Sequence, residues 1–586
     1  MTSRRFAAGL TGIALLALVL RGLFPAADPP WRSTVGVVWH DEGAWVHNAR
    51  NKALYGEWRQ DEWNPVYIAP VFTALEYVAF RAFGVGVRQA RLVSEIAGFL
   101  SVILLALGVR RIAGDRAGLI AGALLATNYV YVMYNRAAIM EALMAAFIVA
   151  SWYCSTRAER EPRWGAAAGV MAALAFFTKA AAAFYVGALA LVMVLRLAQQ
   201  WNTGAGRNRP LDLAPKGGSH EFETGGSRET QTSGAALWTL AGLAVSFGLV
   251  LALFVLPHWS DYRFYNWQIS VTRKPSYDLA SVVRRVTWFP ILHDTFSRMW
   301  GVLCLGVCGA WGIVARWRRA GDPERLLLLW VAIGSLELLV HDVSNERRFV
   351  FLIPALVALA GVVLVRGALL PDEARAVRRG TVLILAPLIL YTGYVLAGPL
   401  TRVPFLEEVY AHVLRSAVRL AAVTGLVAGL AVVALWPRIA AGATRRSWSP
   451  AAAHALVALF VAWNVFQFGD WAVHRSYENY DASVALGRAL PPDTLVQGKL
   501  ANGLALENRI RPIFIGHEFG NYDDRKQRWD VRYILTYTDP AIGYEGDQIV
   551  DVLAAYPGWQ IIMTFDVAET PSGHDRAALI EKRARH

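Results

Sequence analysis

Runs of mostly apolar residues, each long enough to cross a membrane, recur along the whole sequence and constrain the fold more than any other feature. A helix needs about 20 such residues to span the hydrocarbon core of a bilayer. Of the 586 residues, 55% are apolar or aromatic (AVILMFWYC) and only 18% are charged. The chain therefore lacks the polar surface of a soluble protein of this size, and it is far too apolar to be disordered throughout. We predict a polytopic α-helical membrane protein with about thirteen transmembrane helices, centred near Ala14, Leu104, Ala123, Ala145, Ala173, Ala188, Leu249, Gly306, Ala332, Leu356, Ile384, Gly425 and Val457.

Basic residues give the chain a net charge of +13, and most of them fall in short loops between the apolar runs. If the N-terminus is cytoplasmic and the spans alternate, every inside loop carries arginine or lysine, as the positive-inside rule requires. The odd number of spans then places the C-terminus outside. Because membrane orientation accounts for the positive charge, we expect membrane lipid, and not nucleic acid, as a partner.

Polar segments define the domain organisation. Residues 1–470 form the predicted transmembrane domain, which includes a first outer loop at 27–90 with short amphipathic helices in the interface, a flexible cytoplasmic loop at 202–234 and a second outer loop at 258–297. Residues 471–586 alternate strand-like and helix-like stretches, which predicts a small soluble α/β domain on the extracytoplasmic side. Strands are expected at 495–498, 512–516, 531–536 and 559–563.

The same alternation places polar and ionisable side chains from distant stretches of the chain on the outer face. Such groups at membrane depth are costly and usually functional. Glu141 and Lys179 interrupt otherwise apolar runs, which favours function, with snorkelling or local pairing as the alternative. For Arg347 and Arg348 the alternative is contact with lipid headgroups. The outer group comprises Asp41, Glu42, Asn135, Arg136, Glu141, Lys179, His258, Asp261, Arg263, Arg273, Lys274, His341, Asp342, Glu346, Arg347 and Arg348.

Four short motifs in this group resemble those of the GT-C glycosyltransferases. The segment His40-Asp41-Glu42-Gly43-Ala44-Trp45 resembles the acidic motif that opens the first outer loop in the branch with protein O-mannosyltransferases and the lipid A aminoarabinose transferase. Three later segments are similar to further elements of that family: Asn135-Arg136 with Glu141, Phe177-Thr178-Lys179, and Asn345-Glu346-Arg347-Arg348-Phe349. The resemblance covers residues 1–365. The chain departs from it at Ala44-Trp45, where the family often has an aromatic pair, and at Glu141, where it often has Asp.

The resemblance implies a glycosyltransferase that takes a hexose or pentose from a polyprenyl-phosphate donor. The acceptor would be a hydroxyl of a glycolipid, glycan or protein, at the outer face of the inner (plasma) membrane. Transfer would proceed with inversion. No cofactor is required and no metal site is assigned, although a divalent cation stays open. The implied catalytic residues are Asp41 as general base, Glu42 and Glu141; the donor-phosphate residues are Arg136, Lys179, Arg273, Arg347 and Arg348; the substrate-binding residues are Trp45, Asn135, His258, His341 and Glu346.

A transporter or lipid flippase is the alternative from another class, because it would also gather polar groups between spans. Transporters usually place such groups near the bilayer midplane and often contain inverted repeats. This sequence places them at one interface and has no strong internal repeat, which favours the enzyme.

Overall fold

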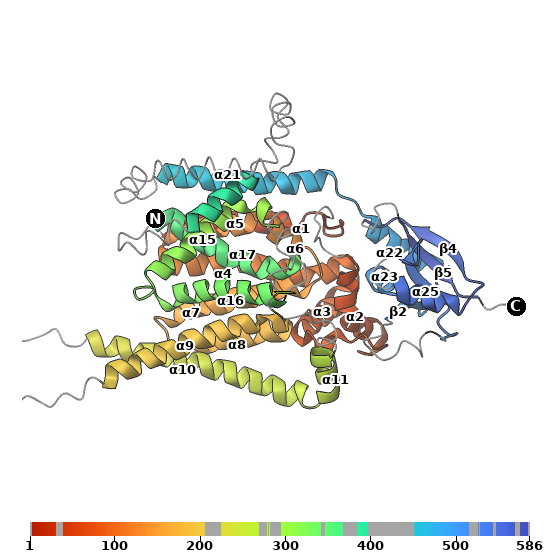
Figure 1. The fold of residues 1–586 in the computed structure, drawn as a ribbon, viewed down its shortest axis with the longest axis horizontal. Helices are drawn as coiled ribbons and strands as arrows, with labels where there is room; N and C mark the ends of the chain where they lie inside the picture. The colour runs from red at the N-terminus through yellow and green to blue at the C-terminus, as the bar shows by residue number, and fades with distance from the viewer. Residues whose placement is uncertain are drawn as a thin grey trace, which may run out of the picture.

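The computed structural model describes residues 3–30, 39–205, 224–268, 278, 280–281, 295–341, 346–366, 384–395, 450–514, 526, 528–542, 546–568 and 575–583. Most of them form a helical bundle, and a small sheet lies at one end of it (Figure 1). The main elements of the bundle are α1 (Ser3–Gly22), α4 (Val87–Ala113), α5 (Asp115–Thr127), α6 (Tyr129–Asn135), α7 (Met140–Ala158), α8 (Trp164–Thr178), η2 (Ala180–Ala182), α9 (Ala183–Ala205), α10 (Thr224–Val250), η3 (Leu251–Val255), α15 (Trp300–Ala315), α16 (Asp322–His341), η6 (Glu346–Leu352), α17 (Ile353–Arg366) and α21 (Pro450–Val473).

Six of the described helices are long and apolar enough to cross a membrane, and a seventh is counted if the bent pair α5–α6 forms one span. The bend lies at Asn128, whose side chain accepts a hydrogen bond from the Tyr131 amide at 2.9 Å and so caps α6. Every predicted span centre except Gly425 lies in a described helix, and Gly425 lies outside the described residues. The helical membrane fold is thus confirmed, while the count of thirteen spans stays a prediction.

Glycines allow α8 and α10 to pack backbone against backbone. A Cβ atom on Gly169 would lie 2.3 Å from the carbonyl oxygen of Thr239, and one on Gly242 would lie 2.3 Å from that of Ala166. Lipid tails are as apolar as leucine, so helices in a membrane associate through such close packing and not through a hydrophobic force.

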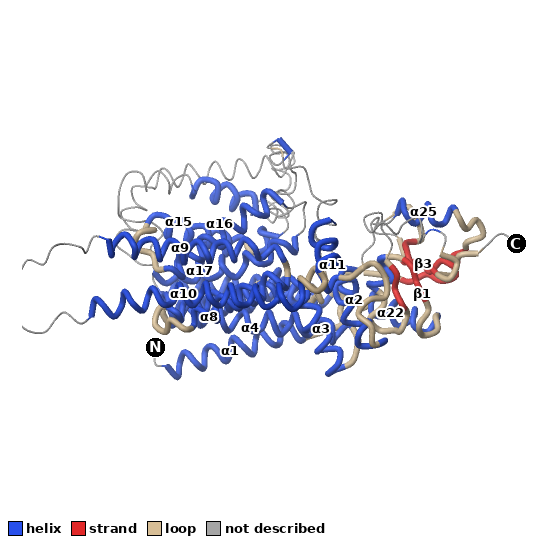
Figure 2. The backbone as a smooth tube through the Cα atoms, turned by 90° about the horizontal axis from the view of Figure 1, so that it is seen from below, coloured by secondary structure: helices blue, strands red, loops and turns tan. Residues whose placement is uncertain are grey.

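The first outer loop forms helices that lie between the bundle and the sheet: α2 (His40–Tyr55), η1 (Pro65–Tyr67) and α3 (Pro70–Phe83) (Figure 2). Helix α3 buries Phe72 and Phe80 and exposes Val78 and Phe83, as an amphipathic helix in the interface should. The second outer loop contributes α11 (Trp259–Arg263) and η4 (Phe264–Gln268) to the described residues. Helix α10 begins at Thr224, so part of the segment predicted as a cytoplasmic loop, 202–234, is helical.

The C-terminal segment folds around a five-stranded sheet of order β2-β1-β3-β5-β4. Strand β1 is parallel to β2 and β3, whereas β5 is antiparallel to β3 and β4. Four strands fall where the sequence predicts them, but β5 was not predicted. The elements of this C-terminal segment are α22 (Glu478–Ala489), β1 (Leu495–Gln497), α23 (Lys499–Gly503), β2 (Arg511–Ile513), β3 (Tyr533–Tyr537), α25 (Gly546–Ala554), β4 (Gln560–Phe565) and β5 (Ala577–Glu581).

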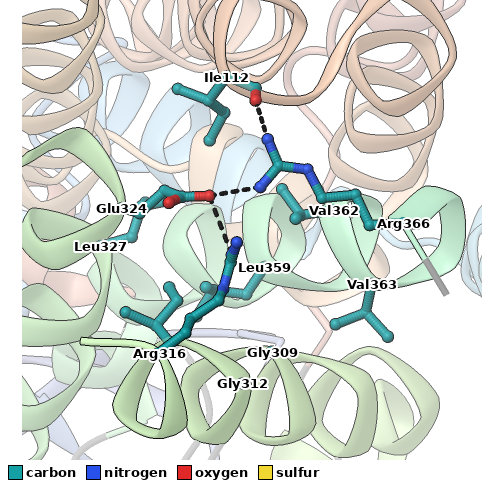
Figure 3. A pocket seen from close by; sticks show the side chains of 11 residues that line it. Ile112, Gly309, Gly312, Arg316, Glu324, Leu327, Leu359, Val362, Val363 and Arg366 are labelled. Atoms are coloured by element: carbon teal, nitrogen blue, oxygen red, sulfur yellow. Dashed lines mark hydrogen bonds and ion pairs between the residues drawn. The ribbon is translucent and has the colours of Figure 1, made fainter. Parts of the chain in front are cut away.

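Helix α4 runs from the side of the C-terminal segment to the remote end of the bundle, where the carboxylate of Glu324 in α16 joins the ends of α15 and α17 (Figure 3). Near the sheet, the Val87 amide donates to Glu507 at 2.7 Å. At the remote end, Glu324 Oε1 accepts hydrogen bonds from Arg366 Nη1 at 2.6 Å and from Arg316 Nη2 at 3.0 Å, beside a cavity of about 100 Å³. Arg316 directly follows α15 and Arg366 ends α17, so this cluster ties helix ends together at the end of the bundle remote from the C-terminal segment.

Candidate functional site

Asp41 lies in the first turn of α2 and is held by two cations from distant elements. The guanidinium of Arg347, in η6, forms an ion pair with Asp41 Oδ2. The ammonium of Lys499, in α23, lies 3.2 Å from Oδ1. All three side chains are largely withdrawn from solvent, with relative exposures of 11–16%. The transmembrane bundle and the C-terminal domain therefore meet on one carboxylate.

Glu141 belongs to the same group through Arg347 and Lys179. It lies in the first turn of α7 and is fully buried. Its Oε1 atom lies 2.6 Å from Lys179 Nζ and 3.3 Å from Arg347 Nε, while Oε2 has no hydrogen-bond partner among the described residues. Lys179 directly follows α8 and has an extended backbone conformation, which allows its side chain to contact Glu141. We call Asp41, Glu141, Lys179, Arg347 and Lys499 the Asp41 cluster.

The cluster has an excess of positive charge, with three cations against two carboxylates. Burial raises the pKa of Asp41, but Lys499 and Arg347 outweigh burial and hold the pKa of Asp41 well below its usual range. Neighbouring His40 lies 4.0 Å from Asp41, and burial, with help from Lys499, lowers the pKa of His40 to about 3. At neutral pH, Asp41 is thus ionised and His40 is neutral.

Glu42, the next residue, makes its contacts with other elements and fixes α2 on the bundle. Its carboxylate accepts hydrogen bonds from Arg91 Nε at 2.8 Å, from Arg91 Nη2 at 2.7 Å and from the Ala138 amide at 2.8 Å. Arg91 also donates to the carbonyls of Pro25 and Ala27. Burial and the charge of Glu42 raise the pKa of the buried neighbour Glu76 well above its usual value.

The C-terminal domain is fixed to α2 by contacts that also place Lys499. Arg50, fully buried in α2, donates to the carbonyls of Ala505, Asn508 and Ile510 at 2.9–3.0 Å. Trp39, just before α2, packs in the core of the C-terminal domain. A Cβ atom on Gly43 would lie 1.8 Å from the Asn502 carbonyl oxygen, so α2 and α23 approach backbone to backbone.

The turn into α23 needs a glycine. Gly498 has φ of +120°, a conformation that other residues rarely adopt, and its amide donates to the Ile513 carbonyl at 3.0 Å. Lys499 follows directly and is thereby directed toward Asp41. Sequence reasoning missed Lys499 and Arg91. A lysine after a strand and an arginine at the start of an apolar run carry no signal that names their partners.

Other predicted site residues lie outside the Asp41 cluster. Arg136 donates to the carbonyls of Leu20, Arg21 and Phe24 at 2.7–3.2 Å and stacks 4.6 Å from the Trp471 ring centroid. Asn135 accepts a hydrogen bond from Arg21 at 3.0 Å. Both therefore join the end of α1 to the rest of the bundle.

Trp45 and His258 pack among aromatic rings of the first outer loop. The Trp45 ring meets Trp63 edge-on at 5.5 Å. The His258 ring lies 5.8 Å from that of Tyr67, and its Nδ1 is 3.0 Å from the Phe254 carbonyl oxygen.

The remaining predicted residues are placed only in part. Arg348 is half-buried beside Arg347 in η6. His341 ends α16 and Glu346 begins η6, but their side chains are not described. Arg273 lies outside the described residues. Within the described part of the chain, no three His, Cys, Asp or Glu side chains are grouped to hold a metal ion.

Comparison with known proteins gives a family match over part of the chain and a shared fold. The sequence matches the dolichyl-phosphate-mannose-protein mannosyltransferase family over residues 67–204. The structure is similar to ArnT from Cupriavidus metallidurans bound to undecaprenyl phosphate, with a TM-score of 0.50 and 17% identity over 98% of this chain and 97% of that one. The apo state of the same ArnT gives a TM-score of 0.51 and 16% identity over 100% and 99%. No curated protein matches the sequence.

The fold and the site thus define a helical membrane protein whose C-terminal α/β segment packs on helix α2. The family match over residues 67–204 and the fold shared with the two ArnT structures agree with the GT-C resemblance of its motifs. At this identity the likeness establishes the fold, so the activity has to be argued from the residues of this chain.

Proposed function

We propose that the protein is a membrane glycosyltransferase that moves a sugar from a polyprenyl-phosphate donor to an acceptor hydroxyl. The observation that carries the proposal is the Asp41 cluster, in which Arg347 and Lys499 hold one buried carboxylate. Two relatives support the donor class: the matching family is named for dolichyl-phosphate-mannose, and one similar ArnT structure contains undecaprenyl phosphate. We place the reaction at the extracytoplasmic face of the inner membrane, with the N-terminus in the cytoplasm.

In this proposal the donor phosphate takes the place of Asp41 on the cations. A carboxylate between two cations is a weak base, because protonation would remove its electrostatic attraction to both cations. A phosphate anion attracts the same cations, and Arg347 can bind it with two parallel hydrogen bonds. Donor binding then releases Asp41 and raises its basicity beside the sugar. The protein would therefore activate its base only when the donor is present.

The transfer step follows from this arrangement. Asp41 removes the proton of the acceptor hydroxyl while the oxygen attacks the anomeric carbon. The bond from that carbon to the phosphate oxygen breaks, and polyprenyl phosphate leaves with the electron pair. Attack opposite the leaving group inverts the anomeric carbon. Arg347, Lys499 and Lys179 stabilise the charge that grows on the phosphate.

The other predicted residues receive supporting roles in this proposal. Glu141 positions Lys179 and Arg347, and Glu42 positions α2. We retain Arg348 and Arg273 as additional phosphate ligands, and His341 and Glu346 as substrate contacts. Arg136 and Asn135 support the end of α1, and Trp45 and His258 shape the first outer loop. Because the cluster supplies three cations, the proposal requires no metal ion.

A turnover assay in detergent tests the proposal against a transporter. The purified protein is given undecaprenyl phosphate carrying a hexose or a pentose together with candidate acceptors, and release of undecaprenyl phosphate is measured. We expect sugar transfer without any membrane gradient, and equal rates with and without a chelator. Gradient-driven substrate movement in vesicles, with no transfer from any donor in detergent, would support the transporter instead.

A further inference from the structure

A groove opens between α21, the segment after α1 and the start of the C-terminal domain. It has a volume of about 790 Å³, within the range of sites that bind small organic ligands. Its lining includes Asp28, Tyr129, Arg298, Trp463, Phe466 and Arg475. None of these residues belongs to the Asp41 cluster.

Asp28 is the buried polar group of this groove. Its side chain is 2% exposed, and Oδ2 accepts a hydrogen bond from Ser476 at 2.8 Å. The other oxygen, Oδ1, has no hydrogen-bond partner among the described residues. Burial raises the pKa of Asp28 to about 6. Leaving a buried acceptor without a partner costs free energy, so such an atom on a groove wall points to a ligand that donates to it.

The rest of the lining favours an uncharged, hydroxyl-rich ligand. Its lining contains three carboxylate residues, Asp28, Asp470 and Glu478, and two arginines, Arg298 and Arg475, so its formal charge does not favour a phosphate. Carboxylates accept hydrogen bonds from hydroxyl groups, and arginines donate hydrogen bonds to them. The groove adds flat aromatic walls: Trp463 and Phe466 stack with centroids 5.8 Å apart. Trp471 donates to the Asp28 carbonyl oxygen at 3.1 Å and so fixes the polar end.

The surroundings of the groove favour a ligand with a lipid tail. Helix α21 exposes Leu459, Phe466 and Val473 along the same flank, which suits contact with lipid tails. Asp28, which lines the groove, also lines a separate gap of about 20 Å³ together with Glu42 and Arg91. Glu42 is the neighbour of Asp41 in α2, so Asp28 lies between the groove and the helix that carries the proposed base.

We propose that this groove binds the uncharged sugar headgroup of a glycolipid, with Asp28 accepting hydrogen bonds from its hydroxyls. Its assignment as the acceptor site rests on the proposed function, whereas the binding itself does not. Donor phosphate and glycolipid would then approach α2 from two directions, on Asp41 and on Glu42.

Native mass spectrometry of the full-length protein in detergent tests this proposal by binding alone. The probes are digalactosyldiacylglycerol, phosphatidylglycerol as an anionic lipid without sugar, and undecaprenyl phosphate. The variants are Asp28→Asn and Phe466→Ala. Phe83→Ala is the matched control, because Phe83 is as exposed as Phe466 (63% and 64%) but lies on α3 outside the groove.

We expect the wild-type protein to bind one digalactosyldiacylglycerol in preference to phosphatidylglycerol, and to keep it when undecaprenyl phosphate binds. Asp28→Asn and Phe466→Ala should each weaken galactolipid binding at least fivefold, with undecaprenyl phosphate binding unchanged. Phe83→Ala should match the wild type. The proposal is overturned if the wild type binds no galactolipid, if both groove variants bind it normally, or if undecaprenyl phosphate displaces it. Because no turnover is measured, absence of transferase activity would leave this result standing.

Discussion

At the scale of single residues, the proposed mechanism requires Asp41 to be ionised in the free protein and basic in the complex with both substrates. Arg347 and Lys499 meet the first requirement, because they hold the pKa of Asp41 well below its usual range despite burial. The second requires that these cations find another anion. A donor phosphate is such an anion, so the cations that contact the proposed base are also the proposed phosphate ligands.

Lys499→Met tests the coupling between Asp41 and the C-terminal domain. Methionine keeps the length of the side chain and removes its charge, so the pKa of Asp41 should rise. A base works only when deprotonated, and activity is lost as pH falls through its pKa. The acid limb of the kcat/KM profile should therefore move to higher pH in the variant, and the KM for donor should rise about tenfold, the effect of one charge-assisted hydrogen bond.

The control for this profile is Lys526→Met, since Lys526 pairs with Asp551 in the same domain and not with the cluster. Its profile should match that of the wild type. Superimposable profiles for Lys499→Met and wild type would remove Lys499 from the site.

At the scale of elements, Glu42 and Arg91 connect α2 to α4, and the pair is buried on both sides. Glu42→Gln leaves the Arg91 guanidinium without its counter-charge, which typically costs about 3–5 kcal/mol. We expect a clear fall in apparent melting temperature in detergent. Glu161→Gln, which removes the carboxylate of the exposed Arg157–Glu161 pair, should leave the melting temperature unchanged. Equal effects from the two substitutions would show that the buried pair does not hold α2.

Gly43 tests the contact between α2 and α23. A methyl group there would overlap the Asn502 carbonyl oxygen and force the two helices apart. Gly43→Ala should therefore increase proteolysis between the bundle and the C-terminal domain and reduce transfer at least tenfold. Gly12→Ala on α1 is the control, because nothing lies within 4 Å of the added atom. Unchanged proteolysis and transfer in Gly43→Ala would contradict the close approach.

Much of the site could be predicted at this scale, because apolar runs mark the membrane helices and successive helices alternate in direction. Runs of apolar residues fix where helices end, and alternation fixes which ends share a face. Asp41, Glu141, Lys179 and Arg347 are therefore predicted on one face, and the structure brings them together. Lys499 could not be predicted, because its position depends on how a separate sheet packs on α2. Strand β5 was missed for a related reason: a five-residue strand near the chain end is identified by its partners β3 and β4.

At the scale of the whole molecule, the C-terminal domain completes the site and does not merely accompany the bundle. It supplies Lys499, encloses Trp39 and accepts the hydrogen bonds of Arg50. We expect a chain truncated after Val473 to lose transfer even when it purifies as a monodisperse protein, because Asp41 then lacks one cation and the start of α2 lacks its anchor. Near-normal transfer by the truncated chain would contradict this role.

The affinity of Asp41→Asn for undecaprenyl phosphate, measured beside its rate of sugar transfer, tests the central claim most directly. If the donor phosphate takes Arg347 and Lys499 from Asp41, the variant has lost the competitor for those cations and should bind undecaprenyl phosphate at least as tightly as the wild type. Its transfer rate should nevertheless fall by about 10²–10⁴-fold, the contribution of a general base. Weaker binding together with a near-normal rate would contradict the account.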